Sequence, residues 1–342
     1  DLPFLVARAL SDWPEDEPRP LTVTAATPSY TGDHTDGYRT TVRALVAQLA
    51  GDRPGVDRRV ALFPPMTTPA DLRALARTVA AYGCHPVIVP DPSDTFDGPA
   101  WEDFDPLPTG GTSSAELAAL GTADAGIDLG GGDNGPGALL RQRFATPHAA
   151  LPLPLGVDAC DRFHATLAAV SGRPTPTACA AERARLIDAY RDGHKYVAGR
   201  RAGVYGDAEQ VLAVARLLWE VGMEPAICAT AGDHATLRAG LEASAPAAAA
   251  PITVIAEADY QDLEERLADT EVDLLIGPSR GYRTARERRL PLVRLGFPIH
   301  DRMGAARLRM CDYDGTLALF ERIANACIER AQDGNAVGYL TM

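Results

Sequence analysis

The stretch VDLLIGPSRGYRTARERRLPLVRLGFPIHDR, residues 272–302, decides the fold of the second half of the chain. It contains two short apolar runs, 272–276 and 290–295, and each predicts an inner strand of a parallel sheet because it is short and rich in Val, Ile and Leu. The residues after the first run, 277–282, predict a loop rather than a helix or strand. Since ligands of doubly wound sheets bind outside the carboxyl ends of the strands, we expect any site here to be built from 277–282 and 296–302.

On both sides of this stretch, apolar runs alternate with helical patterns. The strands that we predict are 21–25, 60–63, 86–89, 123–129, 202–205, 225–229 and 252–255. The helices that we predict include 38–49, 158–170, 182–197, 208–221, 235–242, 260–267 and 313–330. This alternation predicts an α/β fold of repeated Rossmann-like units, with parallel sheets flanked by helices and the first unit truncated.

Local signals fix two helix starts. Thr68-Pro69-Ala70-Asp71 predicts an N-cap with proline at the first helical position, and Ser113 with Glu116 predicts a capping box. The domains that we predict are a remnant of an N-terminal α/β domain at 1–36, a second Rossmann-like domain at 37–155, connecting helices at 156–200, a third Rossmann-like domain at 201–302, and a C-terminal helix and tail at 303–342.

Composition excludes several classes of protein. The 342 residues carry a net charge of -13, with acidic and basic residues interleaved, so no basic face is available for nucleic acid. No apolar run approaches the roughly 20 residues that a membrane-spanning helix needs. The six cysteines form no CxxC pair, which predicts small buried side chains in a reducing cytosol. The start at Asp1 resembles an internal cut rather than a natural terminus.

Motifs for self-contained chemistry are missing from the sequence. Gly203 and Gly206 lack the GxGxxG spacing of a dinucleotide loop, and no P-loop, HExxH or GxSxG pattern occurs. His300, Asp301 and Arg302 form the best titratable cluster, either as a structural ion-pair corner or as a ligand or interface contact at the switch point. The pattern favours a subunit whose chemistry needs a partner or a missing segment.

Several motifs along the chain nevertheless resemble one family, the β-type subunits of nitrogenase component 1. They are, in order, 27–32 (TPSYTG), 109–112 (TGGT), 153–159 (LPLGVDA), 171–176 (SGRPTP), 182–189 (ERARLIDA), 205–207 (YGD), 220–225 (EVGMEP), 272–302 and 313–315 (YDG). Pro278, Tyr282 and His300 depart from the family pattern. The run 303–306 resembles a cofactor-assembly scaffold subunit more closely, whereas Ser29-Tyr30 resemble a reductase β subunit more closely. The methylthio-alkane reductases also fit this combination of features.

The resemblance implies an iron–sulfur cluster shared with the partner subunit, and none bound by this chain alone. Its cysteine ligands are expected upstream of Asp1. Ser29 matches a family serine beside that cluster, so Thr27, Ser29 and Tyr30 are the residues expected near it, with Ser29 as a metal ligand. The alternative from the residues themselves is that Ser29 caps a turn.

The function that the resemblance implies is that of a β-type subunit of a nitrogenase-like oxidoreductase active in nitrogen fixation. An ATP-dependent iron protein passes electrons through the interfacial cluster to a cofactor in the α-type partner, within a cytoplasmic heterotetramer. The alternative is a non-catalytic scaffold subunit for nitrogenase cofactor assembly, and a third interpretation is the structural and docking half of either complex. By the same resemblance, 272–302 shapes the subunit rather than holding the cluster.

Overall fold

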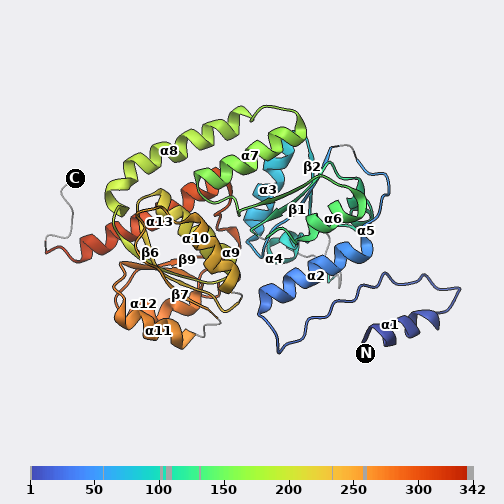
Figure 1. Cartoon of the computed structure of the whole chain (residues 1–342), viewed down its shortest axis with the longest axis horizontal. Helices are drawn as coiled ribbons and strands as arrows, with labels where there is room; N and C mark the ends of the chain where they lie inside the picture. Colours follow the sequence, from blue (N-terminus) through green and yellow to red (C-terminus); the bar gives the residue numbers. More distant parts are fainter. Residues whose placement is uncertain are drawn as a thin grey trace.

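Two lobes, each built on a parallel sheet flanked by helices, make up the chain (Figure 1). A computed structural model describes residues 2–56, 58–100, 103–104, 110–130, 132–232, 234–256 and 260–336. The predicted α/β class with parallel sheets is confirmed. Asp1 and Thr109, which belong to features noted in the sequence, lie outside the described residues.

The first lobe has a four-stranded sheet of order β2-β1-β3-β4, all parallel. Its elements are α2 (His34–Leu49), β1 (Arg59–Phe63), α3 (Pro69–Ala81), β2 (His85–Ile88), α4 (Ser93–Asp97), α5 (Ser114–Ala118), the 3-10 turn η1 (Leu120–Thr122), β3 (Ala125–Leu129), α6 (Pro136–Phe144) and β4 (His148–Leu151). The inner strands β1 and β3 are buried on both faces: along β1, Val60 and Leu62 pack in one core and Ala61 and Phe63 in another.

The second lobe has a five-stranded parallel sheet of order β7-β6-β5-β8-β9. Its elements are β5 (Arg201–Tyr205), α9 (Ala208–Glu220), β6 (Glu224–Ala229), α10 (His234–Ser244), β7 (Thr253–Ile255), α11 (Tyr260–Asp269), β8 (Leu274–Gly277), η2 (Ser279–Gly281), α12 (Tyr282–Glu287) and β9 (Leu292–Arg294). The strand order reverses between β5 and β8, so the carboxyl ends of these two strands mark the switch point where such sheets bind ligands.

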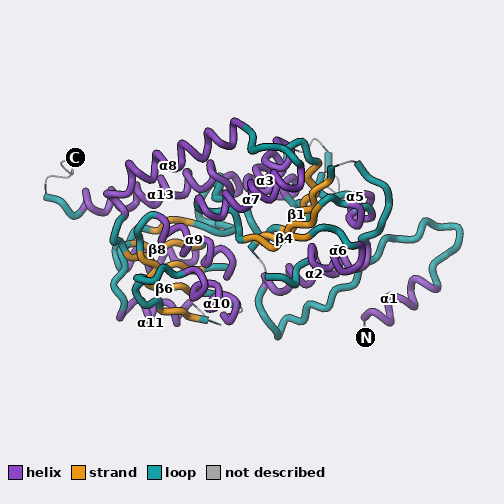
Figure 2. Tube along the Cα trace, turned by 45° about the horizontal axis from the view of Figure 1, so that its top comes forward, coloured by secondary structure: helices purple, strands orange, loops and turns teal. Residues whose placement is uncertain are grey.

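Long helices connect and close the two lobes (Figures 1 and 2). They are α7 (Val157–Ser171) and α8 (Thr177–Val197), which join the sheets, and α13 (Asp312–Asp333), which follows the 3-10 turn η3 (Ala305–Arg307). The helices α8 and α13 pack along each other. They approach closely at Gly193, where an added Cβ would lie 2.5 Å from Cζ of the buried Phe320 ring.

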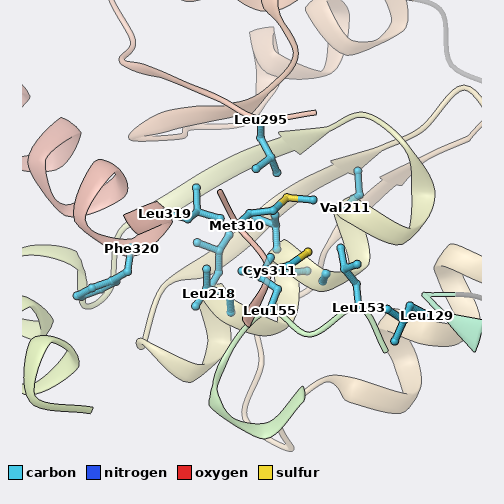
Figure 3. Close-up of a cluster of buried hydrophobic side chains, with 14 of the residues drawn as sticks. Leu129, Leu153, Leu155, Val211, Leu218, Leu295, Met310, Cys311, Leu319 and Phe320 are labelled. Carbon is cyan, nitrogen blue, oxygen red and sulfur yellow. The ribbon is translucent and has the colours of Figure 1, made fainter. Parts of the chain in front are cut away.

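One hydrophobic core runs through both lobes. Leu129 at the end of β3, Leu218 of α9 and Leu319 of α13 belong to the same cluster, and Figure 3 shows such side chains from both halves of the chain gathered together. Burial of each such leucine stabilises the fold by about 1.5–3 kcal/mol. The two lobes therefore share buried apolar contacts through this cluster.

A buried carboxylate fastens the C-terminal segment to the first lobe. Asp71 in the first turn of α3 is fully buried, and its Oδ1 accepts the backbone N–H groups of Met310 and Cys311, both at 2.9 Å. Its Oδ2 accepts the hydroxyl of Thr67 at 3.0 Å. The N-cap predicted at Thr68 is confirmed, since its hydroxyl oxygen accepts the Asp71 N–H at 3.1 Å.

Several details of the structure differ from the sequence predictions. The strand predicted at 21–25 does not form: the backbone of Thr24 bonds instead to the side chain of Gln48, through N to Oε1 at 3.2 Å and through Nε2 to O at 2.7 Å. The loop predicted at 277–282 instead contains η2 and the start of α12. The helix α6 was not predicted.

Beyond the lobes, α1 (Leu2–Ser11) lies at the end of an extended segment and away from both sheets (Figures 1 and 2). The strands β1 to β4 fall within 37–155 and β5 to β9 within 201–302, and the boundaries of the five predicted domains stay a prediction. In the part of the chain that the structure describes, no helix combines the length and the apolar character that crossing a membrane requires.

Candidate functional site

The loop that carries Ser29 is exposed to solvent. Thr27, Ser29 and Tyr30 are all exposed, and Tyr30 keeps 87% of its surface accessible. A turn forms here because the Thr31 N–H donates to the carbonyl of Pro28 at 3.4 Å. The hydroxyl of Ser29 makes no hydrogen bond with any residue for which the structure gives a position, so it does not cap this turn.

The same loop ends in a well-formed helix cap. Asp33 is the N-cap of α2, and its Oδ1 accepts the N–H groups of Thr35 at 2.8 Å and of Asp36 at 3.1 Å. Asp36 in return accepts the Asp33 N–H at 3.0 Å, which completes a capping box. The helix therefore begins at His34, four residues before the predicted start.

A cavity of about 600 Å³ opens at the carboxyl ends of the strands of the second sheet. Its wall includes the ends of β5, β6, β8 and β9 together with α11 and the start of α2. The lining residues are Asp33, His34, Tyr205, Gly206, Asp207, Gln210, Ala229, Thr230, Ala231, Tyr260, Leu263, Pro278, Ser279, Arg280, Gly296, Phe297, Pro298 and His300. Both loops expected to build a site, 277–282 and 296–302, contribute to it.

The two lobes meet at the rim of this cavity. Asp207 is the N-cap residue of α9, and its Oδ1 lies 3.1 Å from Nε2 of His34 in α2. This hydrogen bond with Asp207 raises the pKa of His34 above its ordinary value of 6.5. Gly232 after β6 approaches Asp33 so closely that an added Cβ would lie 2.4 Å from the Oδ2 atom. The loop that carries Ser29 therefore leads directly into the cavity wall.

The floor of the cavity is held by buried polar groups. The Tyr205 hydroxyl donates to the carbonyl of Pro278 at 2.7 Å, which ties the end of β5 to the loop after β8. The buried Gln210 of α9 donates from Nε2 to the carbonyl of Met66 in the first lobe at 2.9 Å. Thr230 is also buried, and its Oγ1 accepts the N–H of Gly232 at 3.3 Å. The cavity is therefore built into both lobes.

The predicted cluster of His300, Asp301 and Arg302 separates into two parts. His300 lines the cavity, and its backbone N–H donates to Ser279 Oγ at 3.3 Å. Asp301 forms a bidentate pair with Arg294, at 2.9 Å from Nε to Oδ1 and 2.7 Å from Nη2 to Oδ2, which holds the pKa of Asp301 below its ordinary value. Arg302 Nη1 also lies 3.4 Å from Asp301 Oδ2, so Asp301 and Arg302 belong to the ion-pair corner, and of the three predicted residues His300 lines the cavity.

The chain offers few soft metal ligands near Ser29. All six cysteines are buried and unpaired, and none belongs to the loop 27–37. Across the described ranges, no three His, Cys, Asp or Glu side chains are grouped as a metal site. These residues do not fit an iron–sulfur cluster by themselves, and Ser29 would supply at most one oxygen ligand.

The cavity residues from the first lobe were missed by sequence reasoning. Asp33 and His34 lie more than 170 residues before their neighbours Asp207 and Gly232, so no local pattern brings them together. The sequence does contain one usable signal, because Asp33 and Asp36 are spaced three residues apart as in a capping box at the start of a helix.

Comparison with known proteins decides the family. A family model described as nitrogenase component 1 type oxidoreductase matches residues 1–328. This chain belongs to that family. The β chain of the nitrogenase molybdenum-iron protein of Clostridium pasteurianum is 30% identical over 322 residues, which cover 91% of this chain and 69% of that protein. The nitrogenase iron-molybdenum cofactor biosynthesis protein NifN of Rhizobium meliloti is 31% identical over 308 residues, covering 89% and 67%.

The fold agrees with this nitrogenase component 1 assignment. A solved structure titled "Nitrogenase Cp1 at pH 6.5" superimposes with a TM-score of 0.90 at 27% identity, over 100% of this chain and 75% of that chain. The relatives of this chain include nitrogenase β chains and NifN, so the chain is a β-type member of the nitrogenase component 1 family. The resemblance predicted from the motifs is confirmed.

Proposed function

We propose that this chain is the β-type subunit of a nitrogenase-like reductase. In this role it takes electrons from an ATP-dependent iron protein, through an iron–sulfur cluster at the subunit interface, to a cofactor in an α-type partner. The observation that carries the proposal is the match to the nitrogenase component 1 family over residues 1–328, together with similarity to nitrogenase β chains. The cluster would supply stepwise electron transfer, and we propose that most of its ligands lie outside residues 1–342.

The exposed N-terminal part supports a partner contact. Phe4 and Leu5 of α1 are 64% and 59% exposed, Leu21 is 65% exposed and Tyr30 is 87% exposed. Single exposed apolar side chains are ordinary on a protein surface, but these four lie on one segment that leads to Ser29. We place the α-type partner against this segment, with the Ser29 hydroxyl directed at the shared cluster.

The second candidate function is a non-catalytic scaffold subunit for nitrogenase cofactor assembly. The similarity to NifN, at 31% identity, is as high as the similarity to the β chain of Clostridium pasteurianum, at 30%. A scaffold would carry a cofactor precursor in the complex and would release it to another protein instead of turning over a substrate.

Reconstitution of the complex separates the two functions. The chain is co-expressed with its α-type partner, iron and acid-labile sulfide are measured, and electron uptake from the iron protein with ATP is followed by electron paramagnetic resonance. The reductase predicts reduction of the cluster and turnover. A pure complex with full iron and sulfide that accepts no electrons would contradict it and favour the scaffold.

The role of Ser29 has its own test. We expect Ser29→Ala to change the resonance signal and the midpoint potential of the oxidised cluster, because a hard oxygen ligand stabilises oxidised iron. Thr31→Ala, in the same exposed turn, is the matched control and leaves both unchanged. Identical signals in the two variants would show that Ser29 is not a ligand of the cluster.

A further inference from the structure

The cavity at the switch point has the size and position of a small-molecule site, and the proposed function does not use it. Its volume of about 600 Å³ falls within the range of roughly 300–1,000 Å³ typical of such sites. It lies between the carboxyl ends of β5 and β8, where the order of the sheet reverses. The charges in its lining indicate what it would bind.

Arg280 is an arginine of this lining that forms no ion pair with a described residue. Within the described part of the chain it forms no ion pair and no side-chain hydrogen bond, whereas Arg283 pairs with Glu287 at 2.8 Å and Arg294 pairs with Asp301. Its positive charge is close enough to His34 to oppose protonation of that imidazole. The guanidinium therefore has its donors available for an anion in the cavity.

The acids of the lining are already engaged. The Oδ1 atom of Asp33 accepts two backbone N–H groups and the Thr35 hydroxyl, the last at 2.6 Å. Asp207 pairs with His34 at 3.1 Å. Asp33 therefore keeps its negative charge within the cap of α2, and Arg280 is the arginine of the described lining that no carboxylate pairs with.

The N-terminus of α9 adds a second group of donors. Asp207 is its N-cap residue, yet its carboxylate makes no cap hydrogen bond because it is turned to His34. The first-turn N–H groups of this 13-residue helix are therefore not capped by a side chain, and they carry the positive end of the helix dipole. The helix begins directly at the cavity, since Gly206, Asp207 and Gln210 all line it.

The opposite wall is apolar. Leu263 of α11 is buried, and Phe297 and Pro298 after β9 are further apolar residues of the lining. An occupant with charge alone, such as inorganic phosphate, would leave this wall without contact. The combination of one unpaired cation, uncapped amides and an apolar wall describes an anion that is attached to an apolar body.

We propose that this cavity binds a small organic anion, with its carboxylate or phosphate group held by Arg280 and the N-terminus of α9 and its apolar body against Leu263 and Phe297. The lining residues all belong to this chain, and Ser29 is not among them. It would give the β-type subunit a ligand of its own, in addition to the cofactor of its partner.

The test is a binding titration of the purified chain, followed by ligand-observed NMR at low ionic strength. The probes are benzoate, phenyl phosphate, the uncharged benzamide, and inorganic phosphate. We expect benzoate or phenyl phosphate to bind, and to bind at least about tenfold more tightly than either benzamide or inorganic phosphate, because binding needs both charge and body. The tighter binder of the two organic anions shows whether the site prefers a carboxylate or a phosphate group.

Matched variants locate the binding. We expect Arg280→Ala to weaken binding by about tenfold or more, Arg280→Lys to recover part of it, and Arg283→Ala, which removes a surface arginine three residues away, to have no effect. Ala231→Phe, at the exposed edge of the lining, should block all probes by filling the mouth. The proposal is overturned if no probe binds at millimolar concentration, if benzamide binds as well as benzoate, or if Arg280→Ala and Arg283→Ala bind alike.

Discussion

Removal of the Asp71 carboxylate should open the junction between α3 and the segment before α13. In Asp71→Ala, the N–H groups of Met310 and Cys311 lose their acceptor inside the protein. Each unsatisfied buried group costs about 1–3 kcal/mol, or about 2–6 kcal/mol for the two. The variant no longer desolvates a carboxylate, whose burial raises the pKa of Asp71, so we expect a net loss of about 2–4 kcal/mol.

Asp71→Asn should be much milder than Asp71→Ala. The amide oxygen of asparagine can occupy the place of Oδ1 and accept the same two N–H groups, so only the advantage of a charged acceptor is lost, about 1 kcal/mol. Comparison of the two variants separates the effect of losing the hydrogen-bond acceptor from the effect of losing the negative charge.

Hydrogen exchange measured on the peptide that contains Met310 and Cys311 is the assay. A loss of about 2–4 kcal/mol predicts that these amides exchange about 30- to 1,000-fold faster in Asp71→Ala. Asp158→Ala, which breaks an exposed pair with Arg162, is the control and should leave them protected. Unchanged exchange in Asp71→Ala, or equal damage from Asp71→Asn, would refute the reasoning.

Three further predictions concern other contacts between elements. The imidazole of His34 should titrate above pH 6.5 by NMR, and Asp207→Asn should bring its pKa back towards that value. The stabilisation from this pair is full below pH 6.5 and is lost as the pH rises through the raised pKa of His34. An unchanged titration of His34 in Asp207→Asn would contradict the pairing. Gly193→Ala should lower the free energy of unfolding by about 1–3 kcal/mol despite the better helix propensity of alanine, because its Cβ would meet the Phe320 ring; a more stable variant in urea unfolding would show that α13 can move aside. Glu220→Ala should cost about 1–2 kcal/mol in the same assay, since this carboxylate accepts two N–H groups at the start of α7, and Glu220→Gln should keep more than half of that stability.

Helix starts could be predicted where the whole signal lies within one turn. The capping box of Ser113 and Glu116 and the cap at Thr68 are confirmed because each is complete within three residues. The start of α6 has a comparable signal that we did not use, a proline at Pro136 in the first turn. Local chemistry therefore fixes helix starts even when the tertiary structure is unknown.

Strand predictions fail where no neighbouring strand is available. The segment 21–25 has strand propensity, but propensity reflects a fit to a pleated, half-buried surface. In the structure, the side chain of Gln48 bonds to Thr24 instead. The runs within 272–302 did form strands, since β5 lies beside β8 and β8 beside β9. Pairing is a property of the whole fold and is invisible in a short window.

The candidate site could be predicted only in part. The loops after β8 and β9 were expected at the carboxyl edge from strand order alone, and they line the cavity. The contribution of Asp33 and His34 depends on how the lobes pack, which no spacing in the sequence encodes. Ser29 was identified by resemblance, and in the structure it is exposed to solvent.

The bonds between Asp71 and the segment at 310–311 also set an order of events during synthesis. The partners of this carboxylate are separated from it by 239 and 240 residues. At roughly 5–20 residues per second, a ribosome needs about 10–50 seconds to add them. The last strand of the first sheet ends at Leu151, and for the rest of that interval a position beside α3 stays open because the donors of Met310 and Cys311 are still missing. In a nascent chain of this protein, the first lobe is therefore fully translated long before all of its buried hydrogen bonds can form.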